Sequence, residues 1–189
     1  MKENLKLIEP AIEFDRAIQA FRAQFLFPGM SMDGGGGLIR LDDTKEWLRR
    51  VAKARADEAT LQYIYLRETD GKVVGVLQIR LRLDDTAQRY SGHIGYAVAP
   101  SERRKGYATQ MLTRALEICR ERGLARVLVC CLKDNEASRR TIKRCGGVYE
   151  STVYQSERDR YLERYWVDLE LRTDKKDSGD IFANYSIQE

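Results

Sequence analysis

The chain has 189 residues, of which 43% are hydrophobic and 33% charged, with 33 Lys and Arg against 29 Asp and Glu for a formal net charge of +4. These proportions are ordinary for one soluble globular domain, long enough to bury a sizeable core. No apolar run approaches membrane-spanning length and the first ten residues lack a signal-peptide core, so a cytoplasmic protein without a membrane partner is expected.

The first third of the chain predicts a strand, two helices and a glycine-rich loop. The expected elements are a strand at Leu5–Ile8, a helix at Ile12–Phe27 and a second helix through Ala54 that Asp43 and Glu46 can cap. Pro28 and the run Asp33–Gly37 lie between the helices and predict a loop. We expect this loop to be either a mobile lid over a binding pocket or a simple linker.

β-Rich segments occupy the next part of the chain. Leu61–Leu66 and Val73–Leu83 flank Asp70-Gly71, which is a strong hairpin signal. The second of these strands alternates in its later part, which predicts one exposed face. Asp84-Asp85 predicts a turn, and His93–Val98 predicts another strand.

The segment Val98–Arg122 combines a strand end, a basic loop and an amphipathic helix. The loop presents Arg103, Arg104 and Lys105 before Gly106, and the helix then shows apolar residues at helical spacing until Gly123 stops it. A helix begins with backbone N–H groups that lack intrahelical partners and carry partial positive charge. The small residues at 106 and 108 let a phosphate approach that backbone. The competing interpretation is a solvated basic turn before a surface helix; we favour an anion site for a diphosphate, formed by Arg103, Arg104, Lys105, Gly106, Tyr107, Ala108 and Thr109.

The rest of the chain completes an α/β pattern. The expected elements are a buried strand at Val127–Leu132, a helix from Asp134 or Asn135 to Cys145, and strands at Val148–Tyr154 and Tyr165–Leu171. The strands at Val98 and Val127 flank a helix and should be parallel, whereas the other strands look antiparallel. We therefore predict one domain over residues 1–172, a mixed, mostly antiparallel sheet with helices on both faces, followed by a polar tail over 173–189.

A resemblance to a known family follows from these residues. The segment Arg103-x-x-Gly106-x-Ala108, after a strand that ends Val-Ala-Pro, resembles the pyrophosphate loop of the GNAT superfamily of N-acetyltransferases, which reads Arg/Gln-x-x-Gly-x-Gly/Ala. Asn135-Glu-Ala-Ser138 after the next strand, and Gly146-Gly147 closing the following helix, match a second family feature. The clear resemblance covers the middle third of the chain.

The resemblance implies a fold, a co-substrate and a reaction. In the family the two parallel strands splay apart and hold the pantetheine arm of acetyl-coenzyme A, whose diphosphate the loop binds. A backbone N–H near Val98 is the implied oxyanion donor, and Asn135 and Ser138 are implied to contact the arm, although Asn135 also suits a helix cap. The implied activity is direct acetyl transfer to a small-molecule or peptide amine, in a protein for which a homodimer is one possible arrangement.

The sequence departs from the family at the proton-handling positions. A tyrosine and a glutamate that many relatives carry are replaced by Ile142 and Cys130, and Gly92 stands where another group carries a glutamate. His93 is the remaining candidate base, because an unperturbed histidine has a pKa of about 6.5, which suits general-base work. The alternative is a structural role for His93. Tyr96 and Tyr149 are further candidates. The alternative function is therefore an acyl-coenzyme A sensor module of the same fold without turnover.

Charge and cysteine usage argue against a nucleic-acid-binding protein and against a metalloprotein. The basic residues lie mainly in the 103–105 loop and around Arg139–Arg144, without a stripe of stacking aromatics, so a nucleic-acid partner is not expected. Cys119, Cys130, Cys131 and Cys145 lack C-x-x-C spacing and are accompanied by one histidine, so we expect reduced thiols and no metal site.

Overall fold

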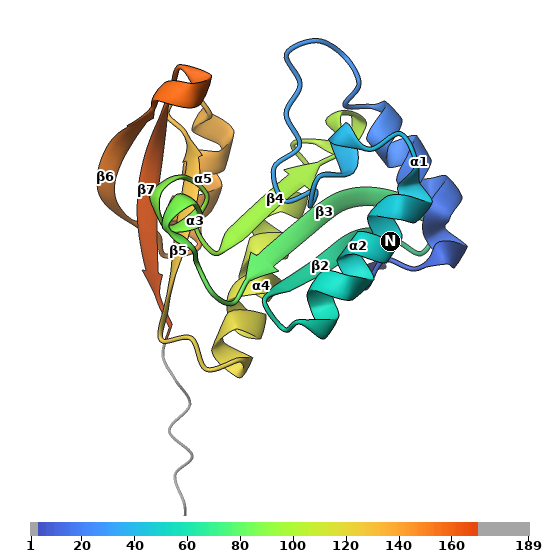
Figure 1. Ribbon diagram of the computed structural model, residues 1–189, viewed down its shortest axis with the longest axis horizontal. Helices are drawn as coiled ribbons and strands as arrows, with labels where there is room; N and C mark the ends of the chain where they lie inside the picture. Colours follow the sequence, from blue (N-terminus) through green and yellow to red (C-terminus); the bar gives the residue numbers. More distant parts are fainter. Residues whose placement is uncertain (1–3, 170–189) are drawn as a thin grey trace, which may run out of the picture.

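A seven-stranded mixed sheet in the order β1-β2-β3-β4-β5-β7-β6 forms the centre of the molecule in this computed structural model, which describes residues 4–169 (Figure 1). The predicted domain boundary at 172 and the tail over 173–189 lie outside the described residues. The strands are β1 (Leu5–Ile8), β2 (Thr60–Arg67), β3 (Lys72–Arg80), β4 (Ile94–Val98), β5 (Arg126–Leu132), β6 (Val148–Gln155) and β7 (Arg160–Asp168).

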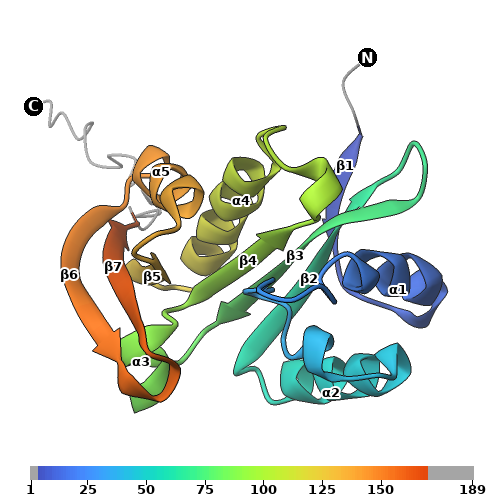
Figure 2. The same ribbon diagram turned by 90° about the horizontal axis from the view of Figure 1, so that it is seen from above.

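Helices cover both faces of the sheet, as predicted. Figure 2 shows α1 and α2 on one face and α4 and α5 on the other. The helices are α1 (Asp15–Ala23), α2 (Thr44–Ala56), α3 (Asp85–Tyr90), α4 (Tyr107–Glu121) and α5 (Glu136–Arg144), with 3-10 turns at Ile12–Phe14, Leu38–Arg40, Pro100–Glu102 and Ser156–Arg158. None of the helices in the described range is both long and apolar enough to cross a membrane.

Two layers of core follow from strand alternation. Val76 of β3 packs into a cluster with Phe21 and Trp47 beneath α1 and α2, whereas Leu77 packs into a cluster with Leu112 beneath α4. The middle of β3 is therefore buried on both faces. Its later part alternates as predicted, because Gln78 and Arg80 are partly buried whereas Ile79 between them is fully buried.

The parallel pair β4–β5 is present and diverges immediately. The two strands align as a parallel ladder only at Ile94↔Val129. Beyond that point β4 stays paired with β3, and β5 stays paired with β7 through Leu132. The sheet is thereby divided into a half with β1–β4 and a half with β5–β7, which is the splay that the resemblance implied.

Some element boundaries differ from expectation for local reasons. Asp84 and Asp85 do not merely turn the chain, because the Asp84 carboxylate accepts a hydrogen bond from the Ala87 amide at 2.7 Å and caps α3. That helix has six residues, too few for periodicity to reveal it. α1 ends at Ala23 instead of Phe27, and β7 starts at Arg160 instead of Tyr165.

The glycine-rich loop is packed against the sheet. The backbones of Gly34 and Gly95 come so close that a Cβ built on Gly34 would lie 2.0 Å from the Gly95 oxygen. Trp47 donates its indole N–H to the Gly35 carbonyl at 2.9 Å, and Gln62 donates to the Gly34 carbonyl at 2.8 Å. Buried partners from α2 and β2 thus hold the loop on β4, at the edge of the gap between the sheet halves.

Candidate active site

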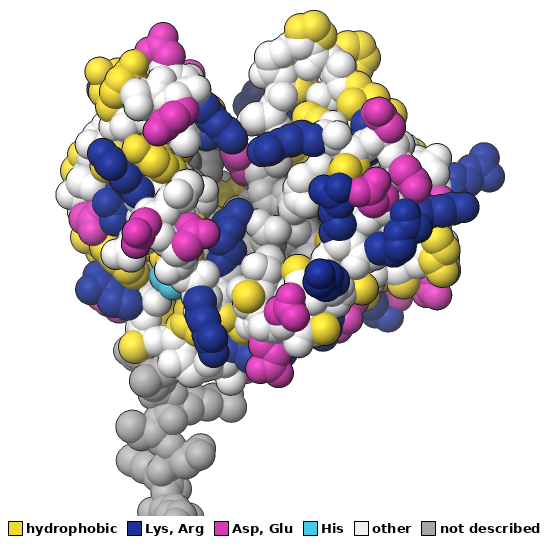
Figure 3. Space-filling model, in the orientation of Figure 1, with side chains coloured by type: hydrophobic (Ala, Val, Ile, Leu, Met, Phe, Trp, Pro, Cys, Tyr) yellow, Lys and Arg dark blue, Asp and Glu magenta, His cyan; other side chains and the backbone are white. Residues whose placement is uncertain are grey.

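A cleft of about 630 Å³ lies where β4 and β5 diverge. It is lined by the segment before the glycine run, by β4, by the 102–106 loop with the head of α4, and by the end of β5 with the start of α5. Figure 3 shows the molecule hollowed between its two halves, with Lys and Arg side chains along both sides of the hollow. The predicted residues that line this cleft are Val98, Arg103, Arg104, Gly106, Tyr107, Ala108, Thr109, Asn135 and Ser138.

The head of α4 has the geometry of an anion site. Gly106 is the N-cap residue with φ 81°, and it offers no side chain to cap the first turn. Arg104 also has a positive φ, 66°, so two left-handed residues shape the loop. A Cβ built on Gly106 would meet no atom within 4 Å, which leaves the approach to the first-turn amides open. The backbone here fits a diphosphate.

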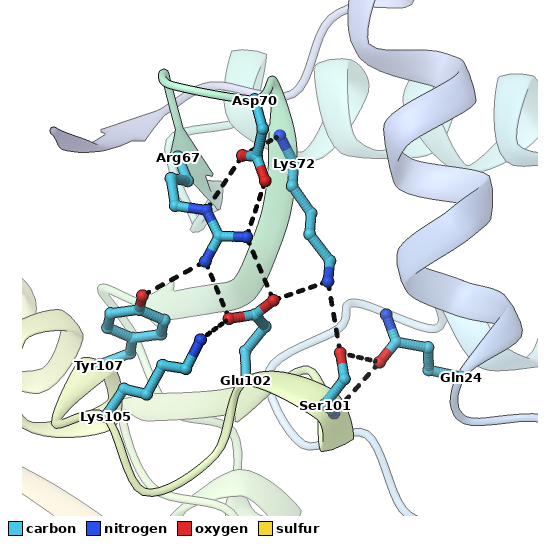
Figure 4. A network of polar contacts seen from close by, with 8 residues as sticks. All are labelled: Gln24, Arg67, Asp70, Lys72, Ser101, Glu102, Lys105 and Tyr107. Atoms are coloured by element: carbon cyan, nitrogen blue, oxygen red, sulfur yellow. Dashed lines mark hydrogen bonds and ion pairs between the residues drawn. The ribbon is translucent and has the colours of Figure 1, made fainter. Parts of the chain in front are cut away.

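Lys105 does not line the cleft, contrary to the phosphate-binding role predicted for it. Its ammonium bonds the Glu102 carboxylate at 2.7 Å, together with Arg67 at 2.9 Å and Lys72 at 2.6 Å (Figure 4). Arg67 also donates from Nη2 to the Asp70 carboxylate, and its Nη1, which bonds Glu102, reaches the Tyr107 hydroxyl at 3.5 Å. These cations, Arg67 first, lower the pKa of Glu102 to about 2. The buried cluster ties the phosphate loop to the β2–β3 hairpin.

Ser138 meets Tyr96 across the cleft, and Asn135 caps the helix that carries Ser138. The Asn135 side chain accepts a hydrogen bond from the Ser138 amide at 3.1 Å and so caps α5, while both residues also line the cleft. The Ser138 and Tyr96 hydroxyl oxygens are 2.9 Å apart. Burial is the main cause that raises the pKa of Tyr96 above its usual value, so this phenol keeps its proton at neutral pH.

The backbone of β4 presents amides to the gap. Ala99 donates its N–H to Val74 of β3 at 2.9 Å, and antiparallel pairing alternates the direction of successive amides. The N–H groups of Tyr96 and Val98 therefore point away from β3. At that level β5 has already separated, so these amides face the cleft.

His93 is not brought to the cleft. Its Nδ1 accepts a hydrogen bond from the Leu128 amide at 2.9 Å, and its ring lies 6.3 Å from that of Trp166. Burial lowers the pKa of His93, which favours the neutral ring that this hydrogen bond requires. The structural alternative for this histidine fits the geometry, and the base role that the sequence suggested does not.

The two departures from the family pattern have different surroundings. Ile142 is fully buried in the core beneath α4 and α5. Cys130 lines the cleft, but burial raises the pKa of its thiol to about 12, so it is a neutral thiol and a poor nucleophile. All four cysteines are free.

Arg139 and Arg140, from the basic segment Arg139–Arg144, are paired with carboxylates of the protein. Arg139 bonds Glu163 at 2.8 Å and also pairs with Glu136, which binds Arg140 at 2.8 Å as well. Arg139 thus holds α5 on β7 through Glu163, and Arg139 and Arg140 share the carboxylate of Glu136.

Asp33 is a cleft residue that sequence reasoning missed. It lines the cleft from the α1–α2 side, next to Gly34. The surrounding protein raises the pKa of Asp33 by desolvation, against the opposing influence of three arginines. Its position directly before the run Gly34–Gly37 is a usable signal in retrospect, because such a run permits the close approach to β4 that delivers the aspartate.

Comparison with known proteins places this geometry in a class. The structure combines a helix whose N-terminus opens into the cleft with a parallel strand pair that diverges beside it. The model of the acetyltransferase (GNAT) family matches residues 37–147. The chain therefore belongs to the GNAT acetyltransferase family. A search of curated proteins finds no match.

Solved structures share the fold at low identity. A ribosomal-protein-S5-alanine acetyltransferase from Vibrio fischeri aligns with TM-score 0.66 and 13% identity over 89% of this chain and 94% of its own. A spermidine N-acetyltransferase from Vibrio cholerae, in complex with CoA and spermine, aligns with TM-score 0.63 and 16% identity over 87% and 95%. The microcin C7 self-immunity acetyltransferase MccE, in complex with acetyl-CoA and AMP, aligns with TM-score 0.67 and 19% identity over 89% and 94%.

Proposed function

We propose that this protein transfers the acetyl group of acetyl-coenzyme A to a primary amine, by direct attack of the amine on the thioester. The observation that carries the proposal is a single cleft that runs between the diverging strands. It has the head of α4, with Gly106, on one side and the Asp33 carboxylate on the other. Acetyl-coenzyme A, when bound, supplies the activated acetyl group.

The α4 side of the cleft holds the co-substrate. The first-turn amides at residues 106–109 suit the diphosphate, and the exposed guanidiniums of Arg103 and Arg104 add positive charge there. Asn135 and Ser138 offer polar atoms along the opposite wall for the pantetheine arm.

The transferred carbonyl and the leaving sulfur need hydrogen-bond donors. The N–H groups of Tyr96 and Val98 face the gap and suit the oxyanion that develops on the carbonyl oxygen. The Tyr96 hydroxyl, beside Ser138, keeps its proton and can donate a hydrogen bond to the departing thiolate. Tyr96 thereby replaces the tyrosine that Ile142 displaces.

The amine must lose a proton as it attacks. Three carboxylates line the cleft, at Asp33, Glu102 and Asp134. Glu102 is engaged by three cations, and Asp134 immediately precedes the capping residue of α5 beside the coenzyme wall. Asp33 lies on the acceptor side with a raised pKa, so it is the residue to receive the amine proton and pass it to solvent.

The test is binding followed by turnover. Calorimetric titration with acetyl-coenzyme A should give one site per chain, and release of coenzyme A thiol should follow when a broad panel of primary amines is added. No measurable binding by the folded protein would end the proposal.

Binding without release from any amine would favour the second candidate, an acyl-coenzyme A sensor. The observation in its favour is that Ile142 and Cys130 occupy the usual proton-handling positions. The related structures are named for acceptors as different as spermidine and a ribosomal protein, so their names do not select the acceptor. A cytoplasmic location and a homodimer stay predictions from the sequence.

A further inference from the structure

The loop between α1 and α2 carries a single charge. Of residues 23–39 only Asp33 is charged, although charged residues make up 33% of the whole chain. Four residues of this loop line the cleft, at Gly29, Met30, Ser31 and Asp33. The acceptor side of the cleft is therefore built from an uncharged segment that presents one carboxylate.

Two large apolar side chains lie next to these lining residues. Leu26 is 53% exposed and Phe27 is 69% exposed. The Phe27 carbonyl accepts a hydrogen bond from the Met30 amide at 3.2 Å, so one tight turn joins the exposed pair to the cleft wall. Figure 1 shows the loop rising above the end of β4, and in Figure 3 hydrophobic side chains gather at that rim of the hollow. The mouth of the cleft is therefore apolar on this side.

The core anchors the turn that exposes this pair. Phe25, directly before it, is 1% exposed, and its ring centroid lies 5.0 Å from that of Phe21. Met30 and Met32, after the pair, pack against the same core cluster. Both ends of the turn are thus held by the core, and the fold keeps the two apolar side chains at the surface, where a ligand in the cleft can cover them.

The other charged residues that line the cleft belong to the coenzyme side. They lie in the 102–106 loop and just before α5, at Glu102, Arg103, Arg104 and Asp134. Where β4 and β5 still pair, the lining residues are Ile94 and Cys130, whose thiol is neutral. The two acids and two arginines of the β6–β7 turn, at residues 157–160, are not among the lining residues. Among the described residues that line the cleft, the acceptor side thus offers one carboxylate, no cation and an apolar surface.

We infer that the acceptor is a monoamine whose remaining part is uncharged and apolar. Its ammonium faces Asp33, and its apolar part covers Leu26, Phe27 and Met30. This inference rests on the proposed function and names the substrate class of the same cleft. A second ammonium or a carboxylate on the acceptor would leave water without meeting an opposite charge on the acceptor side. The chemistry fits a free aliphatic or aromatic amine, and it fits the N-terminal residue of a peptide when that residue has a large apolar side chain.

The first experiment compares amines of one chain length that differ at the far end. Hexylamine, 1,6-diaminohexane and 6-aminohexanoate present a methyl group, an ammonium and a carboxylate there. Coenzyme A release should give a kcat/KM for hexylamine at least roughly tenfold above that of either charged amine. Along ethylamine, butylamine and hexylamine, kcat/KM should rise roughly twofold to fourfold per added methylene. A flat series, or equal efficiency with a charged amine, would overturn the inference.

Three further probes distinguish a free amine from a peptide. C-terminally amidated Phe-Gly-Gly and Gly-Gly-Gly differ only in the first side chain, and 2-phenylethylamine carries the same ring without a peptide. Phe-Gly-Gly should exceed Gly-Gly-Gly in kcat/KM in either case. A still higher value for 2-phenylethylamine assigns the site to free amines, and a lower one assigns it to peptide N-termini. Equal efficiency of the two peptides would contradict the apolar contact.

Variants locate that contact. Phe27→Ala should lower the ratio of kcat/KM for hexylamine to that for ethylamine roughly fivefold, because the ring no longer covers the longer chain. Ile12→Ala is the matched control, since Ile12 is 62% exposed in the 3-10 turn before α1. Ser31→Asp adds a second carboxylate to the cleft wall and should raise the efficiency of 1,6-diaminohexane relative to hexylamine roughly tenfold. A Phe27→Ala ratio equal to that of Ile12→Ala would contradict the inference.

A binding measurement keeps the two proposals separate. Calorimetry of each amine with protein saturated in coenzyme A reads acceptor recognition without turnover. If no amine is acetylated but hexylamine binds more tightly than ethylamine and 1,6-diaminohexane, and loses that advantage in Phe27→Ala, the transferase proposal fails and the apolar monoamine site stands. If hexylamine has no such advantage in binding, the site is overturned.

Discussion

Tyr96 shows how burial decides the role of a single side chain. A phenol with a raised pKa is a weak acid, so it acts in the cleft as a hydrogen-bond donor that retains its proton. Tyr96→Phe removes the hydroxyl and keeps the ring that packs beside α4. We expect kcat to fall roughly tenfold to a thousandfold with KM for acetyl-coenzyme A nearly unchanged, as measured by steady-state kinetics.

The control for this prediction is Tyr154→Phe. Tyr154 is 45% exposed on β6 and its hydroxyl bonds Asp159 at 2.8 Å, away from the cleft. Its kcat should match that of the unaltered protein. A Tyr96→Phe variant with full kcat would show that the leaving thiolate needs no donor from this residue.

Ionisation of Asp33 should produce the acidic limb of the pH profile of kcat/KM. The pKa of Asp33 is raised, and only the ionised carboxylate can accept a proton. As pH falls through the raised pKa, kcat/KM should fall because the carboxylate becomes protonated. Asp33→Asn should lower kcat/KM roughly a hundredfold or more and remove this limb from the pH profile. A profile whose acidic limb survives unchanged in Asp33→Asn would exclude Asp33 as the base.

At the scale of elements, Glu102 joins the 3-10 turn before the phosphate loop to the β2–β3 hairpin. It is 4% exposed and binds Arg67, which is 9% exposed. Removing one member of a buried charged cluster leaves the other uncompensated, so Glu102→Gln should lower the free energy of unfolding by about 2–4 kcal/mol in denaturant titrations at pH 7. Glu117→Gln, which alters an exposed pair with Arg114, should change it by less than about 0.5 kcal/mol.

The same cluster has a defined pH dependence. The folded-state pKa of Glu102 is about 2, below the ordinary value of 4.5. Its stabilisation is therefore present above pH 4.5 and is lost as pH falls toward 2. The stability difference between the unaltered protein and Glu102→Gln should shrink on acidification, and a difference that stays constant would contradict this account of the cluster.

The two ends of α4 offer a matched pair of glycines. Gly106 and Gly123 both have φ 81°, and a Cβ on either would meet no atom within 4 Å. Gly106→Ala and Gly123→Ala should therefore lose similar stability, about 1 kcal/mol each. Only Gly106→Ala should weaken acetyl-coenzyme A binding, by roughly tenfold or more in calorimetry, because its methyl group would enter the phosphate approach. Equal affinities in both variants would place the diphosphate elsewhere.

At the scale of the whole molecule, local patterns predicted the elements better than their long-range relations. The amphipathic spacing of α4, the loop before it and the Asp70-Gly71 hairpin are encoded in neighbouring residues and were found. The orientation of Lys105 depends on the cluster around Glu102, and that of His93 depends on the amide of Leu128. The other members of that cluster and Leu128 are distant in sequence. Asp33 reaches the cleft only because Gly34 and Gly95 approach each other.

The splay itself was known from the family resemblance and not from spacing. Nothing in a strand's own residues specifies that β4 and β5 align in parallel only at Ile94↔Val129 before diverging. That geometry arises because each strand has a second partner, β3 or β7, whose pairing continues. The cleft is therefore a property of the assembled sheet.

Amide hydrogen exchange with and without coenzyme A tests whether the coenzyme binds in the cleft between the two halves of the sheet, because it reports on both halves at once. We expect slower exchange on ligand addition at residues 104–109 and at residues 132–138, which face each other across the cleft, with α2 at residues 44–56 unchanged. Saturating coenzyme A that leaves residues 104–109 unprotected would contradict this expectation.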